Sequence, residues 1–402
     1  NLDTWMMGED VCRELFERSA ASADISVIEG VMGLYDGSID SSGDGSSAHL
    51  AKVLNTPVIL VVNVKGAAQS AGAVVMGFRE FDKEVNLAGV ILNNIASESH
   101  YECVKTAIEE SCSVAVLGYL NKDSDITIPE RHLGLIPSEE KKVSSDLYDK
   151  LGQMVIETID TDRLLEIAGS PGDFPDYNKS IFINRDSSLE VTLAIARDSA
   201  FCFYYQDDID LFESMGAEIK LFSPLADKSL PDGIDGIYIG GGFPELFAER
   251  LMKNESMRSS IVEAYKQGAV IYGECGGMMY LLEKLIDCDG RSFKMSSVHN
   301  GTSKMEKRRQ GLGYVIVDVI CDTVISRKGD TFRAHEFHWS GLQDIPESTF
   351  FAYNTMKSNG KRTGVDGICK GNILASYTHI HFSSNPALAK NMLSSMAERV
   401  QI

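Results

Sequence analysis

Apolar and polar positions alternate along the first half of the chain in a pattern that predicts strands separated by helices. Residues 57–64, 87–94 and 114–120 are nearly uninterrupted apolar runs, which are typical of strands buried in a parallel sheet. Residues 67–81 and 97–110 stand between these runs and have the amphipathic pattern of helices. The first half therefore predicts an α/β domain with parallel strands.

The segment before these strands carries the same kind of pattern. Residues 8–22 predict an amphipathic helix, residues 25–28 a short strand that ends at Glu29, and residues 46–54 another helix. An acid at the carboxyl end of a parallel strand is well placed to hold Mg²⁺ or the water around ATP-bound Mg²⁺.

A polar segment separates this half of the chain from a second predicted α/β domain. Residues 138–179 are polar, begin with a predicted helix at Glu139 and end in turn residues from Gly169. We place the boundary between about 170 and 190, so that the domains are 1–180 and 190–402. Beyond it, strands are predicted at 191–196, 219–222, 236–240 and 269–272, with helices at 207–215 and 244–253.

The strongest candidate for chemistry is the stretch Gly-Glu-Cys-Gly-Gly at 273–277. It lies between the strand at 269–272 and a helical pattern that begins at Met278, as a nucleophile elbow does, with Cys275 in place of serine. A helix N-terminus favours the thiolate, which is the reactive form of cysteine. The alternative is a buried structural cysteine, which is a common role for cysteine.

A nucleophilic thiol needs a base and a site for the developing oxyanion. Residues 374–382 alternate like a strand, which would place His379 and His381 on one face, and we choose His379 as the base. The glycine-rich loop after the strand at 236–240 supplies backbone N–H groups, so Gly241 and Gly276 are the candidate oxyanion hole. Without a partner, His379 would be an ordinary strand histidine, and the loop an ordinary turn.

Composition narrows the class of protein. The 402 residues are 44% hydrophobic and 24% charged, as in a globular protein, and no apolar run is long enough to span a bilayer. A formal net charge of −20 argues against a nucleic-acid partner. The eight cysteines show no metal-ligand spacing, and with no visible signal peptide they indicate a reducing, cytoplasmic setting.

Together these motifs resemble the cobalamin-type class I glutamine amidotransferases, and in particular the cobyrinate a,c-diamide synthase and Ni-sirohydrochlorin a,c-diamide synthase family. The resemblance covers nearly the whole chain and rests on residues 24–37, 129–135, 200–205, 273–277, 335–338 and 376–382. It implies a P-loop-type parallel-sheet domain, similar to dethiobiotin synthetase, followed by a class I glutaminase α/β domain. It also implies a branch in which the acid that usually follows the base is absent, since His381 stands at that position.

The resemblance assigns roles in the nucleotide-binding half. By this resemblance, Glu29 would bind Mg²⁺ and ATP, Asp36 would lie in the substrate and phosphate region, and Asn93 would contact the nucleotide base. No Gly-x-x-x-x-Gly-Lys-Thr loop occurs in the sequence. We therefore expect an N-terminally truncated chain that does not amidate by itself, although Cys275 keeps its reactivity.

The implied activity is ATP- and glutamine-dependent amidation of the a and c acetate groups of a tetrapyrrole, through an acyl phosphate. A polycarboxylate needs a local basic site in so acidic a chain, and Arg308 and Arg333 are our candidates, although such charges are also common in solvated loops. Cobyrinate and Ni-sirohydrochlorin both stay open as substrates, and a homodimer is allowed. The alternatives are a cobyrate synthase-like amidase and a non-catalytic α/β ATPase scaffold.

Overall fold

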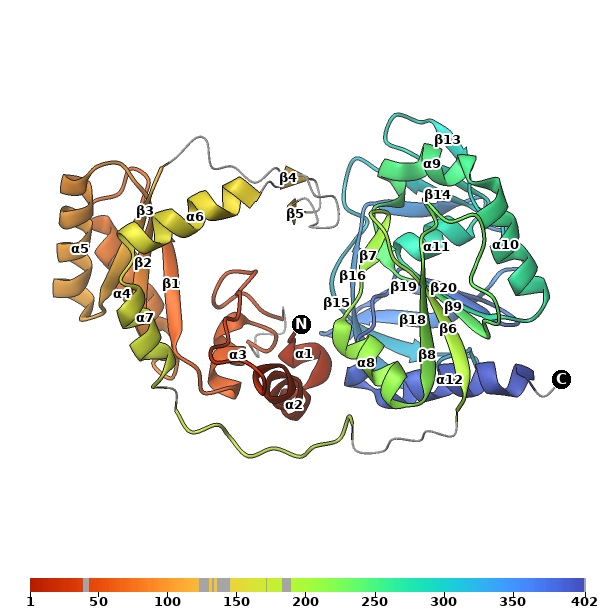
Figure 1. Cartoon of the computed structure of the whole chain (residues 1–402), viewed down its shortest axis with the longest axis horizontal. Helices are drawn as coiled ribbons and strands as arrows, with labels where there is room; N and C mark the ends of the chain where they lie inside the picture. The colour runs from red at the N-terminus through yellow and green to blue at the C-terminus, as the bar shows by residue number, and fades with distance from the viewer. Residues whose placement is uncertain are drawn as a thin grey trace. The chain divides into compact units, whose positions relative to one another are not determined.

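The chain folds into two compact units. The computed structural model describes residues 1–38, 43–122, 130–131, 134–135, 145–170, 172–182 and 189–400 (Figure 1). The large unit contains Asn1–Phe16, Gly37–Gly45 and Asn178–Ile402, and the small unit contains Glu17–Asp36 and Ser46–Tyr177. The division by contacts thus does not follow the order of the chain, because two N-terminal segments belong to the large unit. The boundary was predicted between about 170 and 190, and residues 171 and 183–188 of that range lie outside the described residues.

The small unit is built on a parallel sheet in the order β1-β2-β3, as the sequence pattern predicted. Its elements are α3 (Ser47–Val53), β1 (Val58–Asn63), α4 (Ser70–Phe81), β2 (Leu87–Ile95), α5 (Glu98–Cys112), β3 (Val116–Asn121), β4 (Glu130–Arg131), β5 (Gly134–Leu135), α6 (Ser145–Thr158) and α7 (Thr161–Ala168). Helix α2 (Glu9–Ala20) precedes them. The polar helix predicted to begin at Glu139 starts outside the described residues.

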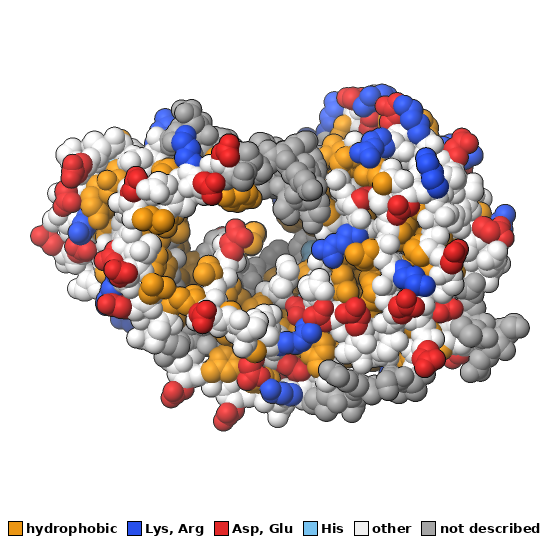
Figure 2. All heavy atoms as spheres, viewed as in Figure 1, with side chains coloured by type: hydrophobic (Ala, Val, Ile, Leu, Met, Phe, Trp, Pro, Cys, Tyr) orange, Lys and Arg blue, Asp and Glu red, His pale blue; other side chains and the backbone are white. Residues whose placement is uncertain are grey.

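The core of the small unit lies between the sheet and the helices α4 and α5. Val75 of α4 and Val104 and Ile108 of α5 are fully buried against Val90 and Leu92 of β2. Strand β1 has no neighbour on its outer side among the described strands. Its Val61 is 59% exposed, and Figure 2 shows further hydrophobic side chains open on this unit at the left of the view.

The strand expected at residues 25–28 does not form. This segment has no regular secondary structure and pairs with no other segment that the structure describes, and Val27 is 92% exposed. A strand requires ladder hydrogen bonds with a neighbour, which the local apolar pattern alone does not supply. The prediction of a strand that ends at Glu29 was therefore wrong.

The large unit contains a mixed sheet in the order β16-β15-β18-β19-β20-β11-β9-β6-β8. The strands from β20 to β8 are parallel to one another, and those from β16 to β19 are antiparallel. The elements before the middle of this unit are β6 (Val191–Ala196), β7 (Phe201–Phe203), α8 (Gln206–Ser214), β8 (Ala217–Phe222), β9 (Gly236–Ile239), β10 (Gly241–Gly242), η2 (Pro244–Phe247), α9 (Ala248–Lys253) and α10 (Glu255–Lys266).

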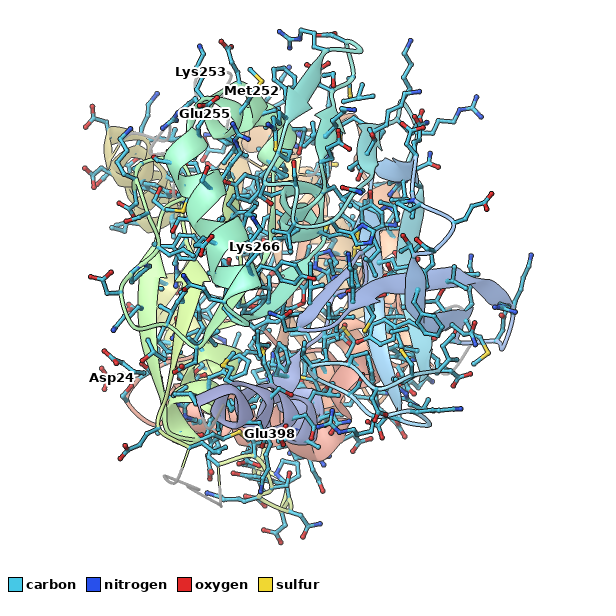
Figure 3. The ribbon with its side chains drawn as sticks, turned by 90° about the vertical axis from the view of Figure 1, so that its right-hand side faces the viewer. Asp24, Met252, Lys253, Glu255, Lys266 and Glu398 are labelled. Atoms are coloured by element: carbon cyan, nitrogen blue, oxygen red, sulfur yellow. The ribbon has the colours of Figure 1, made fainter. Side chains whose placement is uncertain are left out.

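The second part of the large unit contributes the strands β11 and β20 to the parallel portion of the sheet, and all of its antiparallel strands, β15, β16, β18 and β19. Its elements are β11 (Val270–Glu274), α11 (Gly276–Leu281), β12 (Lys284–Ile286), β13 (Ser292–Lys294), β14 (Thr302–Met305), β15 (Gly311–Val319), β16 (Thr331–His338), β17 (Ser340–Gln343), β18 (Phe350–Lys357), β19 (Arg362–Lys370), β20 (Ile373–Ser376), η3 (Phe382–Ser384) and α12 (Pro386–Val400). Helix α10 runs along the outside of this unit between the labelled Glu255 and Lys266 (Figure 3).

The central strands are short and completely buried, which explains their continuous apolar sequence. Every residue of β6, β9, β11 and β20 is buried, and Leu193, Ile237 and Ile271 have no exposed surface. Strands covered on both faces have no polar side to show, so their pattern cannot alternate. This core holds the ends of the strands in fixed positions.

The N-terminal segment is an integral part of the large unit. Helix α1 (Thr4–Met7) packs on β16, and the ring of Trp5 stacks on Tyr314 of β15 with 4.5 Å between the centroids. The Tyr314 hydroxyl donates to the carboxylate of Asp3 at 2.7 Å, and Arg333 donates to the carbonyl of Trp5 at 2.8 Å. Buried Glu14 accepts hydrogen bonds from the backbone N–H groups of residues 180–182. Segments far apart in sequence are thereby tied together.

The surface mixes charges of both signs. Figure 2 shows acidic and basic side chains interspersed over the visible face, with no extended basic surface there. In the part of the chain that the structure describes, no helix has the length and apolar character needed to cross a membrane.

Burial in β6 predicts a clear difference between two leucines on neighbouring strands. Leu193 is fully buried and Leu221 of β8 is 56% exposed, so Leu193→Ala should lower the free energy of unfolding by about 2–5 kcal/mol and Leu221→Ala by much less. Urea unfolding followed by tryptophan fluorescence measures this, because both tryptophans, Trp5 and Trp339, lie in the large unit. Equal destabilisation by the two changes would contradict the burial of β6.

Candidate active site

Three neighbouring parallel strands end at the same edge of the large sheet. Strands β20, β11 and β9 lie side by side, and the chain after each carries a segment singled out in the sequence. These segments are the turn into His379, the elbow at Cys275 and the glycine loop at Gly241. Ligands of α/β sheets bind at the carboxyl ends of the strands, so this edge is the candidate site.

The backbone at Cys275 has the geometry of a nucleophile elbow. Its φ of 49° lies in the left-handed region that non-glycine residues seldom adopt, and its N–H donates to the carbonyl of Ser376 at 2.7 Å. A side chain on Gly277 would collide with the carbonyl of Ile239, so only glycine lets α11 pack this close to β9. The strained turn presents the thiol at the start of α11, where Cys275 is 7% exposed.

The structure brings His379 to Cys275, which sequence spacing alone could not do. The His379 side chain hydrogen-bonds Cys275, and its Nδ1 lies 2.8 Å from Oε1 of Glu274. Burial by itself would lower the pKa of His379, but the Cys275 thiolate and the Glu274 carboxylate raise it well above 6.5. This arrangement favours an imidazolium at His379, between the Glu274 carboxylate and the Cys275 side chain.

Glu274 is the acid that the sequence interpretation missed. Its side chain is 2% exposed, and its Oε2 accepts from the Tyr272 hydroxyl at 3.0 Å and from the N–H of Ile380 at 3.4 Å. No acid follows the histidine at the usual position, where His381 stands, and the carboxylate beside His379 instead comes from the residue before Cys275. A signal existed: a carboxylate at the end of a fully apolar strand is costly unless it is paired.

The segment that carries the base is not the regular strand that was predicted. Strand β20 ends at Ser376, because Asp366 accepts hydrogen bonds from the N–H groups of Tyr377 and Thr378 and draws the backbone out of the ladder. The two histidines consequently have different partners. His379 faces Glu274, whereas the fully buried His381 has its Nδ1 3.0 Å from Asp208.

The candidate oxyanion donors lie beside the nucleophile. Gly276 is the first residue of α11, where the N–H has no partner within the helix. A Cβ on Gly276 would lie 3.1 Å from the N of Gly242, and one on Gly241 would lie 3.0 Å from Cε1 of His379. The loop therefore places Gly241 against His379 and brings the amide nitrogen of Gly242 near Gly276.

The two arginines proposed for the substrate are not neighbours. Arg333 pairs in register with Ile316, and Gly311 pairs with His338 at the other end of the ladder. Gly311 lies five residues from Ile316, which is about 17 Å along the strand at ~3.4 Å per residue, and exposed Arg308 lies in the loop before Gly311. The guanidinium of Arg333 lies over the Trp5 ring, 5.0 Å from its centroid.

The remaining candidates are in the small unit. Glu29 and Asp36 are exposed, and Tyr35 anchors their loop by donating to the carbonyl of Phe78 at 2.6 Å. No group of three or more histidine, cysteine or acidic side chains converges for a metal ion among the residues described. A single carboxylate is compatible with Mg²⁺ that keeps most of its ligands from water and phosphate.

A pocket of about 660 Å³ lies at the carboxyl edge of the small sheet. It is lined by Lys65 after β1, by Asn94 near the end of β2, by Ser97 and His100 after β2, and by Asn121 at the end of β3. Asn93 does not line it, but the Asn93 side chain accepts from the N–H of Asn94 at 2.9 Å. Asn94 has a φ of 65°, which turns the chain at the pocket wall.

Comparison with known proteins gives two family matches. Residues 192–387 match the family described as CobB/CobQ-like glutamine amidotransferase domain, and residues 6–130 match the family described as AAA domain. The predicted fold class, a nucleotide-binding α/β domain followed by a class I glutaminase domain, is confirmed by these matches.

Curated relatives match almost the whole chain. Cobyrinate a,c-diamide synthase of Listeria monocytogenes serovar 1/2a is 44% identical, over 98% of this chain and 87% of its own length. The protein of that name from Methanobrevibacter smithii is 39% identical, over 99% of this chain and 87% of its length. Among solved structures, a glutamine amidotransferase covers 51% of this chain and 98% of its own, with 13% identity and a TM-score of 0.39.

The pairing of His379 with Glu274 predicts how pH affects the thiol site. Glu274→Gln replaces a carboxylate that stabilises the imidazolium, so the pKa of His379 should fall. A step that needs protonated His379 is lost as pH rises through that pKa, so the alkaline limb of glutamine hydrolysis should move to lower pH. The rate should also fall at least ~10-fold. Exposed Glu249→Gln is the matched control, and an unchanged alkaline limb in Glu274→Gln would contradict the pairing.

Proposed function

The chain belongs to the cobyrinate a,c-diamide synthase family, and from this premise we propose that Cys275, His379 and Glu274 generate ammonia for the amidation of a tetrapyrrole. It is a glutamine-dependent amidating ligase with a nucleotide-binding domain. The observation that carries the proposal is the thiol in a left-handed elbow, hydrogen-bonded to a buried imidazole that a carboxylate orients.

The glutaminase reaction follows from the charge state of this trio. The Cys275 thiolate attacks the carboxamide carbon of glutamine, and the N–H groups of Gly276 and of the glycine loop at Gly241 stabilise the oxyanion. Protonated His379 donates its proton to the leaving nitrogen, which departs as ammonia and leaves a thioester on Cys275. Neutral His379 then takes a proton from water, which hydrolyses the thioester to glutamate and restores the thiol.

The ammonia is used in an ATP-dependent step. A carboxylate oxygen of the substrate attacks the γ-phosphorus of ATP, ADP leaves, and ammonia displaces phosphate from the acyl phosphate to give the amide. Glu29 would hold Mg²⁺, which would neutralise phosphate charge, and the pocket beside Asn93 and Asn94 would take the nucleotide base. In a member of the family that amidates the tetrapyrrole, a heavy isotope in the carboxylate oxygens of the substrate should appear once in the released phosphate, and unlabelled phosphate would contradict an acyl phosphate.

The substrate we propose is cobyrinate, amidated at its a and c acetate groups, because the curated relatives carry that name. Ni-sirohydrochlorin is a second candidate of the same chemistry, since it also presents acetate side chains on a tetrapyrrole. Asp36 and Arg308 are the proposed substrate contacts, and we retain Arg333 with its guanidinium already engaged by Trp5. A cytoplasmic location and a homodimer remain predictions from the sequence.

Two alternatives make different predictions. A cobyrate synthase-like amidase would share the glutaminase but amidate other side chains, so the positions of the new amides distinguish it. A non-catalytic ATPase scaffold would have no reactive thiol, and the orientation of His379 by Glu274 speaks against it.

Selective alkylation tests the thiol chemistry directly. An electrophilic ketone analogue of glutamine should label Cys275 in the 402-residue chain, and Cys275→Ser should abolish both labelling and glutamine hydrolysis. Cys288→Ser is the matched control. Cys288 is exposed, but its partial burial and the nearby acids raise the pKa of its thiol. Hydrolysis that survives Cys275→Ser, or labelling spread over several cysteines, would overturn the proposal.

The exposed arginine predicts a change in tetrapyrrole binding. Arg308→Ala should weaken the binding of cobyrinate by roughly two- to fivefold, the scale of one solvent-exposed ionic contact. The colour of the tetrapyrrole allows an absorbance titration, with Ni-sirohydrochlorin titrated in parallel to rank the two substrates. Arg163→Ala, on the exposed face of α7 and paired with Glu166, is the control. Equal affinity in both variants would remove Arg308 from the substrate site.

A further inference from the structure

The base His379 lies outside any regular strand, so something other than a ladder must hold it. Strand β20 stops three residues earlier, and the backbone of His379 is tied to β16 by two hydrogen bonds to a single residue. The N–H of His335 donates to the carbonyl of His379 at 3.1 Å, and the N–H of His379 donates to the carbonyl of His335 at 2.8 Å. These two hydrogen bonds link the backbone of His379 to the antiparallel strand β16.

The two imidazole rings are also stacked. Their centroids are 4.7 Å apart, and the ring planes differ by 13°. The Glu274 carboxylate and the Cys275 thiol contact polar atoms of the His379 ring, and the His335 ring covers one of its faces. A ring held by its polar atoms and on a face has little freedom to rotate away from the nucleophile.

His335 is kept neutral by its surroundings. Burial, His379 and His381 together lower the pKa of His335 to about 3, so its ring is uncharged in the working range of pH. The groups around it are those two histidines, Arg333 and Glu336 on its own strand, and Tyr314, which is its partner in β15 and donates to Asp3. A neutral aromatic face attracts a cation, so the stack is strongest when His379 is protonated.

We propose that His335 is a positioning residue for the glutaminase reaction, whose neutral ring and backbone bridge hold His379 between Cys275 and Glu274. His335 touches neither the nucleophile nor the leaving group in this role, and it acts only through the base. The proposal rests on the proposed glutaminase function and adds to it a residue from β16, outside the elbow, the base segment and the glycine loop.

Three substitutions of His335 test separately whether its flat ring and its lack of charge matter. His335→Phe keeps a flat neutral ring and should hold the rate of Cys275 alkylation by the glutamine-like ketone within about threefold. His335→Leu removes the flat ring and should lower the maximal alkylation rate roughly tenfold, with little change in the half-saturating concentration, as expected for the loss of one aromatic stack. His335→Arg keeps a planar group but adds a cation, so the pKa of His379 should fall and the alkaline limb of glutamine hydrolysis should move to lower pH.

His338→Leu is the matched control. His338 lies on the same strand, and its ring stacks on Tyr377 with centroids 3.9 Å apart instead of on the base. A general effect on folding would appear in both leucine variants and in their tryptophan-monitored unfolding, whereas the change in pH profile should be confined to position 335. Maximal rates are compared for the folded fraction of each variant.

Each possible result either supports or overturns the proposal. A rate that falls in His335→Leu and is kept in His335→Phe, with a shifted limb in His335→Arg, supports it. Equal rates in the parent and His335→Leu, or equal losses in His335→Leu and His335→Phe, overturn it. If the unsubstituted chain neither hydrolyses glutamine nor reacts at Cys275, the proposed glutaminase function itself fails. This failure differs from failure of the His335 proposal, because it is seen before any variant is compared.

Discussion

The buried carboxylate of Glu274 is the interaction on which the candidate site depends. It ends a strand with no other charge, and it satisfies at once the His379 ring, the Tyr272 hydroxyl and the N–H of Ile380. An unpaired carboxylate there would be costly, so the segment that carries His379 is drawn to the end of β11. The same pairing that offsets the cost of burial thus assembles the base beside the nucleophile.

Local patterns predicted those parts of the molecule that depend on local forces. The strands at the centre of both sheets and the turn at Cys275 follow from apolar runs and from glycine, and the order of the two domains followed from the resemblance. The roles of Cys275, His379 and Gly276 remain predictions, although the structure brings these residues together.

The features that were missed depend on partners far away in the sequence. Glu274 meets His379 across 105 positions, and Arg333 meets Trp5 across 328. Asp366 sets the end of β20 through its hydrogen bonds, and the pattern of apolar residues in the sequence cannot predict such a polar contact. The segment at 25–28 shows the converse, because a sequence with strand character stays unpaired when no neighbouring strand meets it.

The docking of α1 has a consequence for how the two activities can be inherited or recombined. Residues 6–130 match an AAA domain, yet the stretch from Asn1 to Phe16 folds with the glutaminase sheet. A gene fragment cut at the junction near residue 180 would leave Tyr314 and Arg333 without Asp3 and Trp5, and residues 180–182 without Glu14. A fragment that begins near residue 180 would therefore lack part of the large unit's own fold, which includes Asn1–Phe16.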